Sequence, residues 1–209
     1  MKKEQRIYCI EGVWDYGGRE VEPSVEPMLE MLRRQGQWAA YARRDCATTE
    51  EFKHYINHEW CHRCKTGSVL YIASHGSEGG IRLSDDHPLG LDTLGELLAE
   101  SCEHCLVHFG GCEVLGGDED TVRRRVKTFL EKTWAMGVSG YSVETGWTGT
   151  WAPALGLELM LFSSIKEEGI QLEDGRHFPA LRRVVKGLRE RFDDCGFDLF
   201  TRTDERIRG

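Results

Sequence analysis

Apolar and polar residues alternate along the chain with two periods, one typical of buried strands and the other of amphipathic helices. Short apolar runs predict strands over residues 6–12, 38–42, 68–74, 105–109, 138–143 and 197–202. Apolar residues at helical spacing predict helices over residues 25–35, 48–60, 93–101, 118–132, 154–168 and 179–192. Thr48 and Thr49 with Glu51 mark one helix start, and Asp92 is expected to cap another.

This order of elements predicts the fold class. Regular alternation of strands and helices implies an α/β domain with a mostly parallel sheet of about six strands and helices on both faces. Residues 81–83 and the turn-rich segment SDDHPLG add a small hairpin. The helix over 154–168 is apolar on nearly every side, so we expect a central position for it. One domain over residues 1–209 is the interpretation, since no repeat or long linker interrupts the pattern.

Two of the predicted strands end on reactive side chains. In the run YIASHGSEGG, His75 directly follows the apolar and small residues, and in LVHFGGCEVL, Cys112 stands in a similar place. Glycines lie next to both residues. Reactive groups of open α/β sheets gather beyond the carboxyl ends of the strands. If the two strands are neighbours, His75 and Cys112 leave the same edge about one strand spacing apart, roughly 5 Å.

A thiol and an imidazole at that separation suit nucleophilic catalysis. A free cysteine thiol has a pKa near about 8.5, and a neighbouring imidazolium favours the reactive thiolate. Gly76 would leave its backbone open to a substrate, and its N–H could form an oxyanion hole with that of Cys112. Gly110 and Gly111 would permit a tight turn that exposes the sulfur. The alternative is a buried cysteine and a hydrogen-bonded histidine; finding both at strand ends favours the pair.

Composition narrows the classes of partner. Apolar residues make up 40% of the 209 positions, charged residues 30%, and the net charge is −8. This balance predicts neither a nucleic-acid surface nor an anionic-membrane surface. The segment after MKKEQR is too short for a signal-peptide core, so we expect a cytoplasmic protein. We therefore do not expect the eight cysteines to form a disulfide framework.

Four cysteines suggest a competing site. CHRC and CEHC place Cys61, Cys64, Cys102 and Cys105 in two Cys-x-x-Cys pairs, a spacing that suits tetrahedral zinc. Each pair precedes one of the two strands above, so both would meet at the opposite edge of the sheet. The gap between the pairs exceeds the roughly 15–20 residues usual for zinc ribbons. A structural zinc and ordinary packing at helix–strand junctions both remain open.

Three segments together resemble the caspase-like superfamily, the clan CD cysteine peptidases that include caspases, metacaspases and CHAT proteases. They are YIASHGSEGGIRL, CLVHFGGCEVL and GVSGYSVETGWTGTW. The resemblance implies a caspase-like three-layer α/β/α fold and peptide-bond hydrolysis without metal or organic cofactor. It makes His75 the base, oriented by a backbone carbonyl, Cys112 the nucleophile and Gly76 an oxyanion-hole amide. Papain-like enzymes and class I amidotransferases place the cysteine first, so the order argues against both.

The chain departs from the caspase pattern near the nucleophile. Cys112 follows His75 by 37 positions, fewer than the roughly 50 of caspases. Gly-Gly-Cys-Glu-Val stands in place of Gln-Ala-Cys-x-Gly, and Gly110 replaces the acidic residue of metacaspases. A preference for aspartate is therefore not implied.

Loop residues must then form the substrate pocket. Glu144 and Trp147 follow the fifth strand, and Asp15 and Arg19 follow the first. Glu144 or Asp15 at the base would favour a substrate arginine or lysine, whereas Arg19 there would favour an acidic residue.

Three functions follow. The first is an activatable cysteine endopeptidase acting on polypeptides; the resemblance implies an effector in bacterial antiviral defence or cell death, controlled by a partner protein or a small signalling ligand. The second is a catalytically silent scaffold or ligand-binding switch. The third is a zinc-stabilised binding module.

Overall fold

A six-stranded sheet forms the centre of the molecule. The computed structural model describes residues 5–14, 23–38, 40–64, 67–84, 88–144, 151–167 and 178–202. The strand order is β2-β1-β3-β7-β8-β9. The bounds are β1 Ile7–Glu11, β2 Tyr41–Asp45, β3 Val69–Ala73, β7 Leu106–Phe109, β8 Gly137–Tyr141 and β9 Phe197–Thr201.

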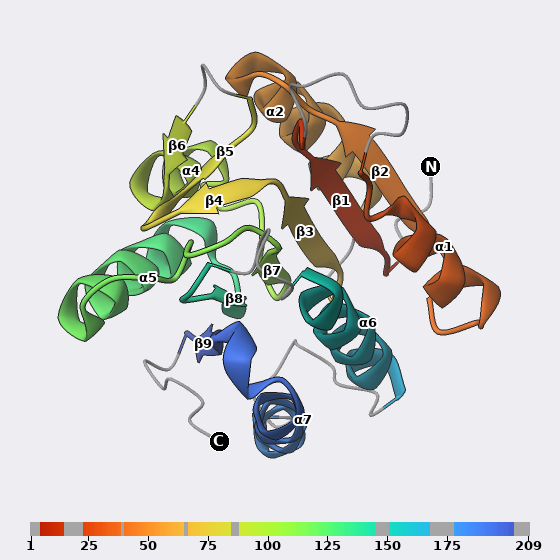
Figure 1. Ribbon diagram of the computed structural model, residues 1–209. Coiled ribbons are helices and arrows are strands. Elements are labelled where there is room, and N and C mark those ends of the chain that lie inside the picture. Colours follow the sequence, from red (N-terminus) through yellow and green to blue (C-terminus); the bar gives the residue numbers. More distant parts are fainter. Residues whose placement is uncertain are drawn as a thin grey trace.

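The first five strands of this order are parallel, and β9 alone runs antiparallel, against β8. Helices cover both faces, which gives three layers (Figure 1). The predicted α/β fold class, a three-layer arrangement around a mostly parallel sheet of about six strands, is confirmed. The antiparallel direction of β9 was not predicted, because apolar runs carry no information on strand direction.

The helices divide into two layers. One face carries α2 (Thr49–Tyr55), the π-helical turn η1 (Ile56–Trp60), α3 (Cys61–Arg63), α4 (Leu91–Leu97) and α5 (Glu119–Thr133). The other carries α1 (Glu26–Arg34), α6 (Trp151–Glu167) and α7 (Phe178–Arg191), followed by the 3₁₀ turn η2 (Asp193–Cys195). The apolar helix α6 lies between α1 and α7, in the central position expected for it (Figure 1).

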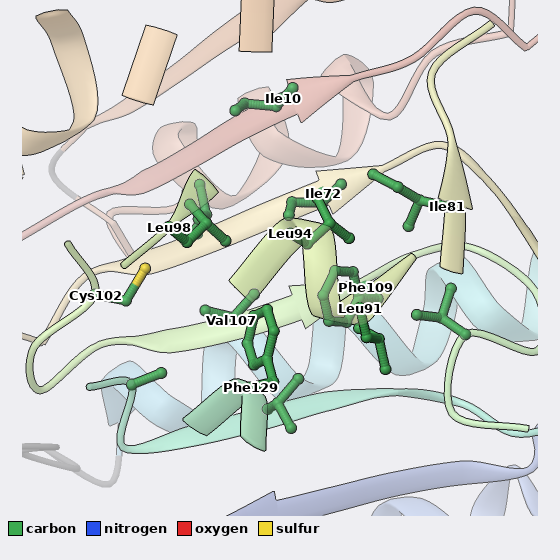
Figure 2. Packing of buried hydrophobic residues seen from close by; sticks show 14 of the residues in the cluster. Ile10, Ile72, Ile81, Leu91, Leu94, Leu98, Cys102, Val107, Phe109 and Phe129 are labelled. Carbon is green, nitrogen blue, oxygen red and sulfur yellow. The ribbon is translucent and has the colours of Figure 1, made fainter. Parts of the chain in front are cut away.

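Alternate residues of each strand enter opposite cores, as the two-residue period of a strand requires. Tyr8 and Ile10 of β1 pack on the α2–α4–α5 side, whereas Ile7 and Cys9 pack against α1 and α6. Figure 2 shows the first core, in which Leu91 and Leu94 of α4 and Leu98 directly after it pack with strand residues. These are Ile10, Ile72 and Val107. Every residue of β1, β3, β7, β8 and β9 is buried, so the ends of these strands are where chemistry can reach solvent.

The predicted hairpin is a small antiparallel sheet beyond β3. Its strands are β4 (His75–Ser77), β5 (Gly80–Arg82) and β6 (Pro88–Gly90), in that order. The chain therefore passes directly from the central sheet into this second sheet at His75.

Several predicted boundaries differ from the observed ones, and two of these differences have a clear physical cause. β2 was expected at 38–42 but begins at Tyr41, because Trp38 is buried under α6, where its indole N–H donates to the Phe162 carbonyl at 3.0 Å. Asp92 was expected to cap α4, but Gly90 is the N-cap and Asp92 lies in the first turn. The Leu91 N–H donates instead to the Gly79 carbonyl, at 2.9 Å, so the hairpin anchors this helix.

None of the helices within the described residues is both long enough and apolar enough to cross a membrane.

Candidate active site

The strands that lead to His75 and Cys112 are adjacent and parallel. β3 pairs with β7 in a register that sets Ile72 opposite Phe109, and the Gly110 N–H continues the ladder to the Ile72 carbonyl at 2.9 Å. The two segments that follow β3 and β7 therefore leave the central sheet at the same edge. This adjacency confirms the topological premise on which the His75–Cys112 prediction depends.

The backbones after the two strands are in direct contact. A side chain on Gly76 would overlap the Cys112 carbonyl oxygen and come within 2.9 Å of the Cys112 nitrogen. A side chain on Gly111 would come within 2.7 Å of the Ser74 carbonyl oxygen and 3.0 Å of the Gly76 nitrogen. Glycine is needed at both positions for this approach. The segment 110–115, called the Cys112 turn below, fills the space beside Gly76 on this side.

A backbone carbonyl holds the imidazole of His75. Its Nε2 lies 2.7 Å from the Trp14 carbonyl oxygen, in the loop after β1. A carbonyl only accepts, so Nε2 carries the proton and Nδ1 is the basic nitrogen of the neutral ring. The Trp14 indole packs edge-on against the ring, with centroids 5.4 Å apart. Two contacts thus fix the tautomer and the plane of His75.

Cys112 differs from most cysteines of the chain in its accessibility. All eight lie within the described residues, and of these only Cys112 and Cys61 are partly exposed. Burial raises the pKa of the Cys9 and Cys102 thiols well above its usual range, and burial with the nearby Glu51 raises that of Cys46 to about 12. Buried thiols of this kind are poor nucleophiles.

A buried polar network lies beneath the Cys112 turn. Glu158 of α6 accepts hydrogen bonds from the hydroxyls of Tyr71, at 2.5 Å, and Tyr141, at 3.1 Å. Its carboxylate also lies 3.2 Å from Nε2 of His108. A side chain on Gly110 would come within 3.1 Å of Glu158 Oε1, so the turn rests directly on this carboxylate. The network ties β3, β7 and β8 to α6 below the site.

The sequence matches the model of one protein family. The model matches residues 4–169, most of the chain, including both strand ends. The chain belongs to the family described as "Family of unknown function (DUF6642)". A search of curated proteins finds no match to this DUF6642 chain.

Among solved structures, the DUF6642 chain is similar to the crystal structure of caspase-1 from Spodoptera frugiperda. The identity is 12% and the TM-score 0.48, over 88% of this chain and 75% of that one.

The predicted substrate pocket is described in part. Glu144 is exposed. The residue before it, Val143, accepts a hydrogen bond from the N–H of Glu113 at 3.1 Å, so Glu144 lies near the Cys112 turn. Its exposure does not suit the base of a pocket. Asp15, Arg19 and Trp147 lie outside the described residues.

A pocket of about 170 Å³ opens at the carboxyl ends of β1 and β2. Trp14 lines it, so it lies beside the residue that holds His75. Its charged lining is mainly acidic: Glu11, Asp45 and Glu51, with Arg43.

The zinc candidates gather in one region. Cys64, Cys102 and Cys105 are buried in the same core, with Cys61 packed against it. Over the part of the chain that the structure describes, no three His, Cys, Asp or Glu side chains are placed to hold a metal ion together. The Cys105 thiol donates to the Glu103 carbonyl at 3.4 Å, and the Cys102 sulfur lies 3.9 Å from the Ser101 hydroxyl oxygen.

Sequence reasoning missed three buried ionisable residues around the site. Glu11 ends the buried strand β1 and is itself buried, which is the same signal that identified His75. Glu158 interrupts an apolar helix, and His108 an apolar strand. An ionisable residue inside an apolar run was the available signal, because such a residue needs a partner when buried.

Proposed function

We propose that this chain is a cysteine endopeptidase with a His75–Cys112 dyad. Two observations carry the proposal. The backbones that follow β3 and β7 are in contact, Gly76 against Cys112, and the hydrogen bond from Nε2 of His75 to the Trp14 carbonyl leaves Nδ1 as the basic nitrogen. The segments resembling caspase-like peptidases agree with it.

The steps follow from that tautomer. Nδ1 of His75 accepts the Cys112 thiol proton, and the thiolate attacks the carbonyl carbon of the peptide bond. The oxyanion of the tetrahedral intermediate accepts hydrogen bonds from the N–H groups of Gly76 and Cys112. His75 then returns the proton to the leaving amine as the C–N bond breaks. Water, deprotonated by His75, hydrolyses the thioester and restores the thiol.

We propose a basic residue before the cleaved bond. The support is the two exposed carboxylates of the pocket beside Trp14, Asp45 and Glu51, together with the exposed Glu144 near the Cys112 turn. An arginine or lysine side chain would form charge-assisted hydrogen bonds there.

The cellular part of the proposal is a cytoplasmic effector, in bacterial defence or cell death, that a partner protein or small signalling ligand activates. Its support is the resemblance of the motif segments and two glycine-rich segments beside the site, the β4–β5 hairpin at 76–80 and the loop at 110–117. Loops of this kind can complete a site when they close.

The test is covalent labelling with arginyl, lysyl and aspartyl acyloxymethyl ketones, followed by mapping of the adduct. We expect the basic reagents to modify Cys112, and Cys112→Ala to abolish both labelling and peptide cleavage. Cys61→Ala is the matched control, because Cys61 is the other partly exposed thiol. Labelling at Cys61, or of no cysteine, would contradict the proposal and favour a silent scaffold.

A further inference from the structure

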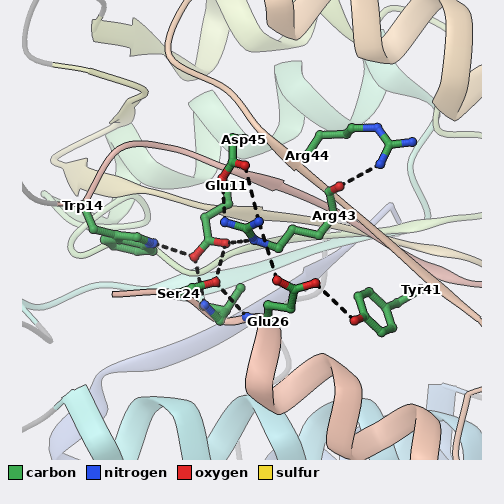
Figure 3. Close-up of polar contacts among 9 residues, drawn as sticks. Glu11, Trp14, Ser24, Glu26, Tyr41, Arg43, Arg44 and Asp45 are labelled. Carbon is green, nitrogen blue, oxygen red and sulfur yellow. Dashed lines mark hydrogen bonds and ion pairs between the residues drawn. The ribbon is translucent and has the colours of Figure 1, made fainter. Parts of the chain in front are cut away.

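A second charged centre lies one loop away from His75. The Glu11 carboxylate is 1% exposed and accepts hydrogen bonds from four donors (Figure 3). These are the Trp14 indole N–H at 2.7 Å, the Ser24 hydroxyl at 2.9 Å, the Val25 N–H at 2.8 Å and the Arg43 guanidinium. A buried carboxylate with this many partners is rigidly placed.

Trp14 joins this carboxylate to the imidazole. Its indole N–H donates to Glu11, while its backbone carbonyl accepts the Nε2–H of His75 at 2.7 Å. The same residue therefore receives its orientation from Glu11 and gives His75 its tautomer. Tryptophan suits this task, because it combines a ring that packs on the imidazole with an N–H that reaches the acid.

The loop that carries Trp14 is also fixed to the strand before His75. The Gly12 N–H donates to the Ala73 carbonyl, and the Val13 N–H to the Leu83 carbonyl, both at 2.8 Å. A side chain on Gly12 would come within 2.8 Å of Ser74 Cβ. Movement of this loop would therefore be transmitted to His75 directly.

We infer that Glu11 is a positioning residue, which holds His75 in its productive tautomer and orientation through Trp14. The inference rests on the proposed function of the His75–Cys112 dyad. Glu11 touches neither substrate nor thiol; it keeps the Trp14 carbonyl aimed at Nε2, so that Nδ1 remains the basic nitrogen. Arg43 balances its charge and is itself held by Asp45 at 2.5 Å.

The test compares Trp14→Phe and Glu11→Gln with wild type. Trp14→Phe removes the indole N–H but keeps the backbone carbonyl and an aromatic ring, and it leaves the Glu11–Arg43 pair in place. Glu59→Gln is the matched control: Glu59 pairs with Arg44, the neighbour of Arg43 on β2, at 2.6 Å, and its side chain is largely buried, with 14% exposed. No contact of Glu59 leads to the Trp14 loop among those the described residues make.

Two readouts separate positioning from stability. In steady-state cleavage, we expect Trp14→Phe and Glu11→Gln to lower kcat about tenfold to a hundredfold while KM changes less than about threefold. In alkylation of Cys112 by iodoacetamide at neutral pH, we expect both variants to approach the slow rate of His75→Ala. Glu59→Gln should keep the wild-type kcat and alkylation rate, even where it lowers the melting temperature.

The outcomes distinguish the two proposals. If His75→Ala slows alkylation but Trp14→Phe does not, the dyad stands and the positioning role of Glu11 is wrong. If wild type and His75→Ala alkylate at the same rate, the proposed dyad itself is wrong. Should Glu11→Gln fail to fold, Trp14→Phe alone decides, and a wild-type rate in it overturns the inference.

Discussion

Gly76 lies where the two strand exits touch, and its lack of a side chain determines how closely they approach. The Cys112 carbonyl oxygen and nitrogen occupy the space that a methyl group at this position would take. The obstacle is backbone, which cannot move aside as a flexible side chain can. The glycine is thus required by packing between two segments far apart in the sequence.

We predict that Gly76→Ala destabilises the fold and displaces the Cys112 turn. Overpacking of this kind costs about 1–3 kcal/mol, and labelling of Cys112 by a peptidyl ketone should fall with it. Thermal unfolding and the labelling rate check the two parts.

Gly187→Ala is the control for that substitution. Gly187 lies in α7, where a side chain would meet nothing within 4 Å. Alanine there should raise stability by about 0.5–1 kcal/mol, since glycine is a poor helix former. A Gly76→Ala protein as stable and reactive as wild type would show that the contact is not tight.

At the scale of elements, helix starts depend on caps that the sequence can indicate but not always locate. Thr48 and Thr49 both suited the start of α2. The structure selects Thr48, whose side chain accepts from the Glu51 N–H, while Glu51 accepts in return from the Thr48 N–H. This capping box fixes the helix that buries Phe52 in the core.

We expect Thr48→Ala to destabilise the protein by about 0.5–2 kcal/mol, the usual loss for an N-cap threonine. Thr49→Ala, one position into the helix, should change the free energy of unfolding by less than about 0.5 kcal/mol. Urea denaturation of both variants measures the difference. Equal losses in the two would mean that the capping box does not operate in solution.

Strand β2 shows where apolar patterns fail at this scale. It carries Arg43 and Arg44, so it does not resemble a buried strand. Both guanidinium groups are paired with acids from other elements, Glu11 and Glu59. β2 is also an edge strand of the sheet, where charged side chains are common. The apolar pattern that predicted the other strands is therefore absent from β2, where ion pairs with residues distant in the sequence take the place of apolar burial.

Over the whole molecule, buried acidic groups with high pKa values tie stability to pH. Burial raises the pKa of the Cys9, Cys46 and Cys102 thiols above that of a free thiol. Burial and the nearby Glu158 raise the pKa of the Tyr71 and Tyr141 hydroxyls above 10.0. The folded state keeps these protons at a pH where the unfolded chain releases them.

Stability should therefore fall as the pH rises above about 8, where the thiols of the unfolded chain begin to ionise. Below that pH both states hold the protons, and the contribution is complete. Each group that ionises only on unfolding adds a slope of about 1.4 kcal/mol per pH unit. Urea denaturation under reducing conditions, from about pH 8 to about pH 10, measures this slope.

Cys46→Ala removes one of the titrating thiols. It should lower the slope by about 1.4 kcal/mol per pH unit, the contribution of one proton, whatever it does to stability at neutral pH. A free energy of unfolding that stays constant over this range would contradict the pKa directions given above.

The sequence by itself determined the layered α/β architecture and most element positions, because strand and helix periods are local and reflect which side of each element is buried. It also indicated His75 and Cys112, since an ionisable or nucleophilic residue at the end of an apolar run stands out locally. Tertiary structure alone decided that β3 and β7 are neighbours, that β9 is antiparallel, and that Trp14 holds the imidazole. These depend on contacts between segments distant in the chain, where backbone hydrogen bonds and burial of charge select one arrangement among many with the same local pattern.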